Sequence, residues 1–311
     1  MQNKVAIILW LYHTDLAEEF KDLLLPHKDS ISIFLGLCKD HDSSLAESIF
    51  KDNFDNINVS YYKNGGTDIL PTLNLLEKAQ KYPLFFKLHT KKNGWGNKKQ
   101  VNWRVLLSND IVYKDNFKHT INMLKRTEVG IVGSKSFIMR NNEYTNHDKI
   151  VELCSILNID YERLRIKSFI GGNVFASKTK LFEIFWTNKK VKELLSKEIG
   201  HIKDNKNGTY VHSMERLFGY IAEYNNKNIL GVPKSSSIIL NPNIKQHRLH
   251  LVRLYNNDCY IQENPNIYGK ILQDAQEHTI IQWSHLDIAE QKYIKHQNFL
   301  VNNNVKSKRS T

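Results

Sequence analysis

Residues 5–11 read Val-Ala-Ile-Ile-Leu-Trp-Leu, a continuous apolar run typical of a β-strand that is buried on both faces. Residues 15–25 follow with apolar side chains at helical spacing. The same alternation continues, with predicted strands at 32–38, 57–62 and 83–88 and predicted helices at 44–54 and 69–81. This order, with short connections, predicts an α/β fold whose sheet is mostly parallel and flanked by helices.

The pattern becomes less regular after residue 92 but remains that of a folded chain. We expect helices at 103–112, 115–126, 147–158, 178–186 and 209–225, and strands at 129–132, 169–176 and 229–232. Beyond about 240 the chain is polar and rich in Asn, His and Arg, with a helical pattern at 279–298. We therefore expect one α/β domain at 1–240 and a mainly helical C-terminal appendage at 241–311, whose tail at 301–311 is disordered.

The chain of 311 residues carries 44 basic and 32 acidic side chains, which gives a formal net charge of +12. This excess favours anionic partners, such as nucleic acids, nucleotide diphosphates or an anionic membrane face. No apolar run approaches the roughly 20 residues of a membrane helix, and residues 1–5 do not open a signal peptide. The 3 cysteines are widely spaced and form no zinc motif. These features predict a cytoplasmic protein.

Polar and flexible residues follow the carboxyl ends of the first four predicted strands, where ligands bind in sheets of this kind. The candidate binding residues there are Tyr12, His13, Asp40, Asp42, Asn64, Gly65, Gly66, Asp68, His89, Lys91 and Lys92. Glycine lets the backbone approach a phosphate and lysine offsets its charge, so the set suits a nucleotide diphosphate. Each motif also has a structural alternative: a helix N-cap at 42–44, a tight turn at 64–66, and solvated lysines at 91–92.

Several short segments resemble the nucleotide-sugar half of GT-A glycosyltransferases. They read DHDSS at 40–44, NGGTD at 64–68 and AQKY at 79–82. Other segments are similar to the rhamnan synthesis protein F family, namely residues 64–71, KLHTKK at 87–92, Trp103-Arg104, VGIVG at 129–133 and GGNVF at 171–175. The resemblance covers residues 5–225.

The resemblance implies a GT-A-like, Rossmann-like fold and a glycosyltransferase of bacterial surface polysaccharide synthesis. It implies a nucleotide diphosphate donor, such as dTDP-rhamnose or another deoxysugar, and a growing or lipid-linked glycan as acceptor. GT-A enzymes place a metal-binding Asp-x-Asp motif after the fourth strand, but this chain has HTK at 89–91. We therefore expect no metal or other cofactor, with His89, Lys91 and Lys92 stabilising the diphosphate. The DHD at 40–42 follows the second strand, where these enzymes contact the base and ribose.

An inverting transferase needs a carboxylate that acts as general base on the acceptor hydroxyl. GT-A folds take this base from the start of a helix after the sixth strand, and Glu215 matches that position. His212 and Arg216 lie close enough on the predicted helix to orient it. Asp68 is the second candidate base, although contact with the nucleotide or donor sugar suits it better. The alternative for Glu215 is a surface ion pair.

We expect the acceptor to lie against Gly171, Gly172 and Asn173, with His212 and Trp95 beside it. The glycines let a sugar approach the backbone, and the Asn173 amide can donate and accept hydrogen bonds. Trp95 stands between two glycines, in a loop that suits a lid. The alternatives are a β-bulge at the glycines and a structural loop anchor at Trp95.

A basic cluster follows in the predicted appendage, at His247, Arg248, His250 and Arg253. It suits a lipid phosphate or peripheral contact with an anionic inner-membrane face, and a solvated surface is the alternative. A nucleic-acid-binding protein would also be basic, but the lysines form no stripe with aromatic residues, so we expect no nucleic-acid partner. A non-catalytic carbohydrate-binding relative of the fold is the remaining alternative.

Overall fold

The computed structural model describes residues 5–91, 103–140, 143–200 and 208–232. The chain divides into one compact unit of Met1–Lys91 with Arg104–Pro233 and a second of Lys92–Trp103 with Lys234–Thr311. The predicted appendage lies outside the described residues, so the domain boundary at 240 stays a prediction.

A mostly parallel sheet confirms the predicted α/β fold. Its strands are β1 (Val5–Leu11), β2 (Ile31–Cys38), β3 (Ile57–Tyr62), β4 (Leu84–His89), β5 (Val129–Ser134), β8 (Phe175–Lys178) and β9 (Asn228–Val232). Within the described residues these strands follow the order β3-β2-β1-β4-β8-β5-β9. β8 runs antiparallel to its neighbours β4 and β5, whereas all other neighbouring pairs are parallel.

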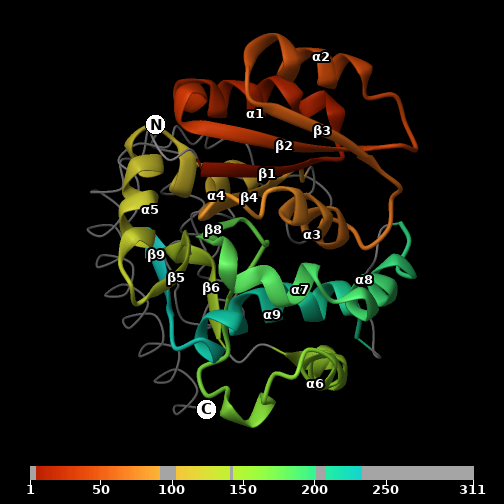
Figure 1. Ribbon diagram of the computed structural model, residues 1–311, viewed down its shortest axis with the longest axis vertical. Helices are drawn as coiled ribbons and strands as arrows, with labels where there is room; N and C mark the ends of the chain where they lie inside the picture. Colours follow the sequence, from red (N-terminus) through yellow and green to blue (C-terminus); the bar gives the residue numbers. More distant parts are fainter. Residues whose placement is uncertain (1–4, 92–102, 141–142, 201–207, 233–311) are drawn as a thin grey trace, which may run out of the picture. The chain divides into compact units, whose positions relative to one another are not determined.

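The order of the first four strands determines the faces on which their helices lie. Right-handed crossovers from β1 to β2 and from β2 to β3 place α1 (Ala17–Leu24) and α2 (Ser44–Asn53) together on one face. The chain then reverses direction to reach β4, so α3 (Ile69–Lys78) lies on the other face. There α3 packs against α7 (Glu183–Trp186), α8 (Lys189–Ser196) and α9 (Tyr210–Tyr224), as Figure 1 shows.

The core lies on both sides of this sheet. Every residue of β1 and β2 is buried, as their continuous apolar runs predict. On the α9 side, the ring of Phe175 on β8 meets the rings of Phe85, Phe182 and Phe218, with centroids 6.0, 5.5 and 6.1 Å away. These contacts join β4, β8 and α9, so the helix is held firmly against the sheet.

The predicted strand 169–176, interrupted at its glycines, is two strands that belong to separate sheets. β7 (Ser168–Ile170) pairs antiparallel with β6 (Ile138–Arg140), and β8 belongs to the main sheet. Gly172 and Asn173 have φ angles of +85° and +58°, which end the first strand and turn the chain toward the second.

The remaining helices are α4 (Trp103–Val112), α5 (Asp115–Lys125) and α6 (His147–Ile156). Together with α9 they confirm predicted helices to within two residues at each end. The predicted helix 178–186 begins as a 3-10 turn, η6 (Thr179–Phe182), before α7. No helix in the described part of the chain is long and apolar enough to cross a membrane.

A glycine permits the close packing of α9 on β7. A Cβ atom on Gly219 would lie 2.3 Å from the backbone oxygen of Ser168 and 2.4 Å from the Cα of Phe169. Any larger residue would therefore push the helix away from the strand. This close approach brings the middle of α9 to the turn at Gly172 and Asn173.

One buried carboxyl group lies between α4 and β5. Asp110 is 4% exposed, and Oδ2 accepts a hydrogen bond from Ser134 Oγ at the end of β5. Its other oxygen has no hydrogen-bond partner within the described residues. Burial raises the pKa of Asp110 to about 7, and the hydrogen bond from Ser134 limits this rise.

Candidate active site

The first four strands end at one edge of the sheet because they are parallel. The N–H of His13, after β1, donates to Thr90 Oγ1 after β4 (2.9 Å). Asn64, after β3, donates from Nδ2 to Tyr12 Oη (3.2 Å) and from its backbone N–H to Asp40 Oδ2 after β2 (3.0 Å). Hydrogen bonds thus bring predicted residues from all four strand ends together.

Aromatic rings surround Tyr12 at the end of β1. The rings of His13 and His41 meet it edge-on, with centroids 5.1 and 5.2 Å away. The ring of Trp10 lies 6.2 Å away at a tilted angle. This cluster gives the edge of the sheet apolar ring surfaces that suit a planar ligand group.

A buried ion pair lies at the same edge. Lys87 Nζ, on β4, donates to Asp68 Oδ2 at 2.6 Å and to the backbone oxygen of Asn173 at 2.7 Å. Asn173 Nδ2 donates to the same Asp68 oxygen at 2.7 Å. His89 Nδ1 lies 3.3 Å from Lys87 Nζ. The Lys87 side chain is 0% exposed and that of Asp68 is 19% exposed, so a lysine inside the sheet binds a carboxylate at its rim.

Local backbone turns direct the Asp68 carboxylate toward the sheet. Gly66 and Thr67 have φ angles of +64° and +49° just before α3. A Cβ on Gly66 would lie 2.6 Å from the Cβ of Leu70, so glycine is required in this turn. Asp68 is the N-cap residue of α3 but makes no side-chain cap bond, which leaves its carboxylate for Lys87.

Asn173 is fixed in position by hydrogen bonds to both its backbone and its side chain. Its N–H donates to Ile170 O at 3.1 Å, in addition to the contacts with Lys87 and Asp68. Because a carboxylate only accepts, the amide nitrogen must face Asp68 and Oδ1 must face away. Oδ1 is buried without a partner in the described part of the chain. An unpaired buried acceptor costs about 1–3 kcal/mol, which a donor group on a bound ligand would offset.

The charges in this group follow from burial and from the ion pair. Burial raises the pKa of the Asp68 carboxyl, but the charge and hydrogen bond of Lys87, together with the smaller effects of His89 and Lys91, outweigh it and hold the pKa well below its usual range. Burial lowers the pKa of His89 to about 3, so its imidazole is neutral near pH 7. The predicted contact of His89 with a diphosphate stays a prediction.

Glu215 reaches this group from α9. Its Oε1 accepts the backbone N–H of Gly172 at 2.8 Å, and Glu215 lines a small hollow together with Phe175 and Phe218. Burial lowers the pKa of Lys87, and the charges of Asp68 and Glu215 both oppose this shift. The two predicted catalytic carboxylates are therefore near one ammonium. Glu215 forms no ion pair within the described residues, which does not favour the alternative of a surface ion pair.

The start of α9 is fixed by side chains. Both carboxylate oxygens of Glu198 accept backbone N–H groups, from Tyr210 and Val211 at 2.8 Å each. Thr209 Oγ1 accepts the N–H of His212 at 3.2 Å and lies 2.6 Å from His212 Nδ1. The backbone N–H groups in the first turn of α9 thus have hydrogen-bond partners within the protein, and the His212 ring contacts the Thr209 hydroxyl group.

Other predicted residues have structural roles in the fold. Asp42 Oδ1 accepts the N–H of Ser44 at 2.9 Å, at the start of α2. The N–H of Gly66 donates to Glu198 O at 2.7 Å, and Gly65 forms an isolated β-bridge with Ile199. The tight turn at 64–66 is thus present, whereas Ser43, the N-cap residue of α2, makes no side-chain cap bond and Asp42 binds the first N–H of the helix instead. Contact of either motif with a ligand stays a prediction.

Several predicted residues lie outside the described part of the chain. They are Lys92, Trp95 and the basic cluster at 247–253. Their predicted contacts with a diphosphate, an acceptor or an anionic membrane stay predictions, as does the cytoplasmic location. Lys91 lies within the described residues, two positions after the end of β4, and is half-buried.

Within residues 5–91, 103–140, 143–200 and 208–232, no group of three or more His, Cys, Asp or Glu side chains is arranged to hold a metal ion. The carboxylate of Asp68 is instead bound to the ammonium of Lys87, which cannot be a metal ligand while protonated. Transfer without a metal stays a prediction, to be tested with a chelator.

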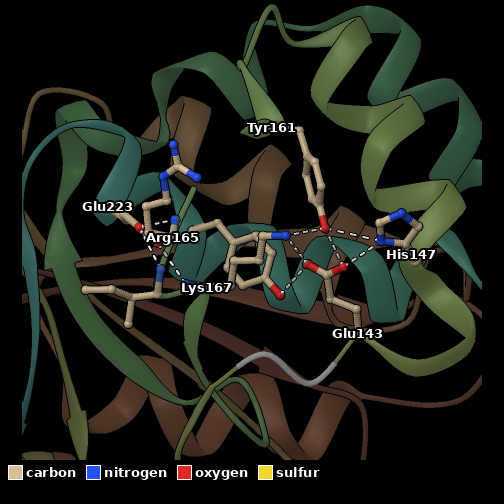
Figure 2. A network of polar contacts seen from close by, with 8 residues as sticks. Glu143, His147, Tyr161, Arg165, Lys167 and Glu223 are labelled. Atoms are coloured by element: carbon tan, nitrogen blue, oxygen red, sulfur yellow. Dashed lines mark hydrogen bonds and ion pairs between the residues drawn. The ribbon is translucent and has the colours of Figure 1, made fainter. Parts of the chain in front are cut away.

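A second polar network holds the segment that leads into β7. The Glu143 carboxylate accepts Tyr161 Oη at 2.6 Å and His147 Nδ1 at 2.8 Å, as Figure 2 shows. Lys167 Nζ donates to Tyr161 Oη, and Tyr220 Oη on α9 donates to Glu143 at 3.1 Å. The network therefore ties residues 161–167 to α9.

Glu223 fixes the same segment from the end of α9. Its carboxylate accepts the backbone N–H groups of Arg165, Ile166 and Lys167 at 2.5, 2.8 and 2.8 Å (Figure 2). Because β7 begins directly after these residues and leads to the turn at Gly172, the two carboxylates position that turn relative to α9. The distance between Gly172 and Glu215 thus depends on a network outside the site.

Lys87 is the site residue that the sequence-based prediction missed. It stands in the strand-like run Leu-Phe-Phe-Lys-Leu-His at 84–89, directly between the apolar residues Phe86 and Leu88. A lysine is almost never fully buried unless it is paired. A lone lysine in a buried strand was therefore the signal for a carboxylate partner.

The comparisons with known proteins agree with the motifs. A search of the curated proteins found no match. The sequence matches the family of rhamnan synthesis protein F over residues 1–227, a range that includes Asp68, Lys87, Asn173 and Glu215. The resemblance to this family is confirmed. The chain belongs to the rhamnan synthesis protein F family.

Proposed function

We propose that this protein is a glycosyltransferase of rhamnan synthesis. It transfers a sugar from a nucleotide diphosphate donor, such as dTDP-rhamnose or another deoxysugar, to a growing polysaccharide or lipid-linked acceptor. The observation that carries the proposal is the convergence of Asp68, Lys87, Asn173 and Glu215 at the carboxyl edge of a mostly parallel sheet. Membership of the family supports the role in rhamnan synthesis.

The donor lies, in this proposal, over the carboxyl ends of the first strands, as in a GT-A arrangement. The ring cluster around Tyr12 provides a surface for the nucleobase. The Asp40 carboxylate and the Asn64 amide are suited to ribose hydroxyl groups. Lys91 and Lys92 offset the charge of the diphosphate without a metal ion.

The transfer is a single displacement with inversion at the anomeric carbon. The acceptor hydroxyl oxygen forms a bond to that carbon, while the bond from the carbon to the diphosphate oxygen breaks and the diphosphate leaves with the electron pair. Glu215 accepts the hydroxyl proton as general base. The N–H of Gly172 holds Oε1 of Glu215, which leaves Oε2 for the hydroxyl group.

Asp68 is less suited to be the base. Its Oδ2 already accepts from Lys87 and Asn173, and Thr67 Oγ1 lies 3.3 Å from Oδ1. The ion pair also keeps this carboxylate ionised, so it has little affinity for a proton. We assign it instead to the donor sugar, together with Oδ1 of Asn173, which would accept a sugar hydroxyl.

A thermal-shift screen with dTDP, UDP, GDP and CMP and their sugars tests the donor assignment. A nucleotide at 100 times its Kd adds about 2.7 kcal/mol of stability, which raises Tm by roughly 5–10 °C in a domain of this size. We expect this rise for one base in the presence of a chelator, and no rise for the matching nucleoside without phosphate. A screen in which no nucleotide raises Tm contradicts the proposal.

A second experiment tests whether sugar transfer requires a metal ion. Product formation from the best donor is measured with a chelator and with added manganese. Equal rates support transfer without a metal. A rate that disappears with the chelator and returns with manganese refutes this part and leaves the glycosyltransferase proposal intact.

A further inference from the structure

Lys87 and His89 lie on the same face of β4, because alternate residues of a strand point to the same side. The Lys87 side chain is 0% exposed and His89 is 5% exposed. The ammonium is therefore a fixed neighbour of the imidazole ring. Its three N–H bonds must be directed to the acceptors that surround it.

Three acceptors surround Lys87 Nζ: Asp68 Oδ2 at 2.6 Å, Asn173 O at 2.7 Å and His89 Nδ1 at 3.3 Å. The carboxylate and the carbonyl can only accept, so they take two of the N–H bonds. The third points to Nδ1, which must then carry a lone pair, and the ring proton lies on Nε2. We propose that Lys87 is a positioning residue that holds His89 as the neutral tautomer with its proton on Nε2.

The charged groups around the ring agree with a neutral form. Burial lowers the pKa of His89 to about 3. Asp68 opposes this shift, whereas Lys87, Lys91 and His13 lower the pKa further. A ligand at this edge therefore meets an oriented N–H donor that carries no charge.

The role of this donor rests on the proposed function, but the tautomer does not. No described residue accepts a hydrogen bond from His89 Nε2. If a diphosphate binds at this edge, Nε2–H is suited to one phosphate oxygen, and the lysines supply the positive charge. His89 would then orient the diphosphate without competing for protons near pH 7.

Nitrogen-15 NMR of the full chain, labelled at histidine, tests the proposal without any ligand. Couplings between ring protons and ring nitrogens distinguish the two neutral tautomers from the cation. The His89 signals are assigned by their absence in His89→Gln. We expect the neutral Nε2–H form at every pH between about 5 and 8. An Nδ1–H form, or titration of His89 in this range, overturns the proposal.

Lys87→Met tests whether the lysine is responsible. Without the ammonium, His89 Nδ1 faces Asp68 Oδ2 at 3.7 Å, and we expect the ring to carry a proton on Nδ1. His27 is the internal control, because its Nε2 lies 2.8 Å from Val112 O and must donate to it in both proteins. If Lys87→Met folds and its His89 signals are unchanged, the positioning role of Lys87 is overturned. If the variant does not fold, the pH titration of the wild-type protein still decides which tautomer His89 adopts.

Inorganic pyrophosphate is the probe for the ligand contact. A shift of the His89 Nε2 resonance, with His27 unchanged, supports a bond to a phosphate oxygen, and no shift overturns that assignment. Nucleotide binding without a shift at His89 would refute only the role of His89. The proposed function would then stand on the thermal-shift screen alone.

Discussion

Replacement of Lys87 by methionine tests the buried ion pair most sharply. The variant keeps a long apolar side chain but removes an ammonium that is 0% exposed and bound to Asp68, Asn173 and His89. Loss of one partner from a buried ion pair costs about 3–5 kcal/mol, because the other charge is left without compensation. At roughly 2–4 °C per kcal/mol, Tm should fall by roughly 6–20 °C. Urea unfolding followed by circular dichroism gives the change in free energy directly.

A double-mutant cycle isolates the pair from other effects of the substitution. Asp68→Asn alone and Lys87→Met alone should each destabilise the fold, and the double variant should lose less than their sum by about 1–3 kcal/mol. Lys178→Met is the matched control, since Lys178 also lies in the sheet and donates to Arg126 O at 2.7 Å but is only half-buried. A loss below about 1 kcal/mol for Lys87→Met, or strict additivity in the cycle, would refute the argument.

Three further predictions concern the other carboxylates. Burial raises the pKa of Asp110 to about 7, so the folded state favours its protonated form. The free energy of unfolding should therefore fall by up to about 1.4 kcal/mol per pH unit as pH rises from about 4 to 7. Urea unfolding should show Asp110→Asn gaining stability over wild type at pH 8 but not at pH 4, and an equal effect at both would contradict this. Glu215→Gln should lower the transfer rate by about 10²–10⁴ with nucleotide affinity retained. Glu183→Gln is the control and should leave the rate unchanged. Equal rates in the two variants would exclude Glu215 as the general base. Glu223→Ala should speed hydrogen exchange of the amides at 165–167 at least roughly tenfold, as the loss of about 1.4 kcal/mol implies, and unchanged exchange would show that the segment is held elsewhere.

The fold of the first half could be predicted because buried parallel strands read as continuous apolar runs. Val5–Leu11 is buried at every position, as its sequence indicates. The order of strands in the sheet could not be read from such runs, because pairing joins segments far apart in the chain. The antiparallel insertion of Phe175–Lys178 between β4 and β5 is an example, since the strand pattern carries no direction.

The candidate site was predictable in its parts but not in its connections. Asp68 and Asn173 were both expected near a ligand, yet the bond between them spans 105 positions in sequence. The ion-pair partner of Lys87 could likewise not be predicted, because a lysine in a strand does not indicate which carboxylate in the chain binds it. The neutral state of His89 depends on its burial and on that lysine, and neither can be read from the motif HTK.

The central claim is that a nucleotide diphosphate binds at the carboxyl edge of the sheet with lysine in place of a metal. Isothermal titration with the best nucleotide, in the presence of a chelator, tests it on wild type, Lys91→Ala and Lys180→Ala. Lys180 is the matched control, because the pairing of Lys178 with Leu84 places it near the opposite edge of the sheet, where it is 85% exposed. We predict that Lys180→Ala binds like wild type and that Lys91→Ala loses about 1.5–3 kcal/mol, or roughly ten- to hundredfold in Kd. Absence of binding by wild type, or equal affinity in Lys91→Ala, would contradict the claim.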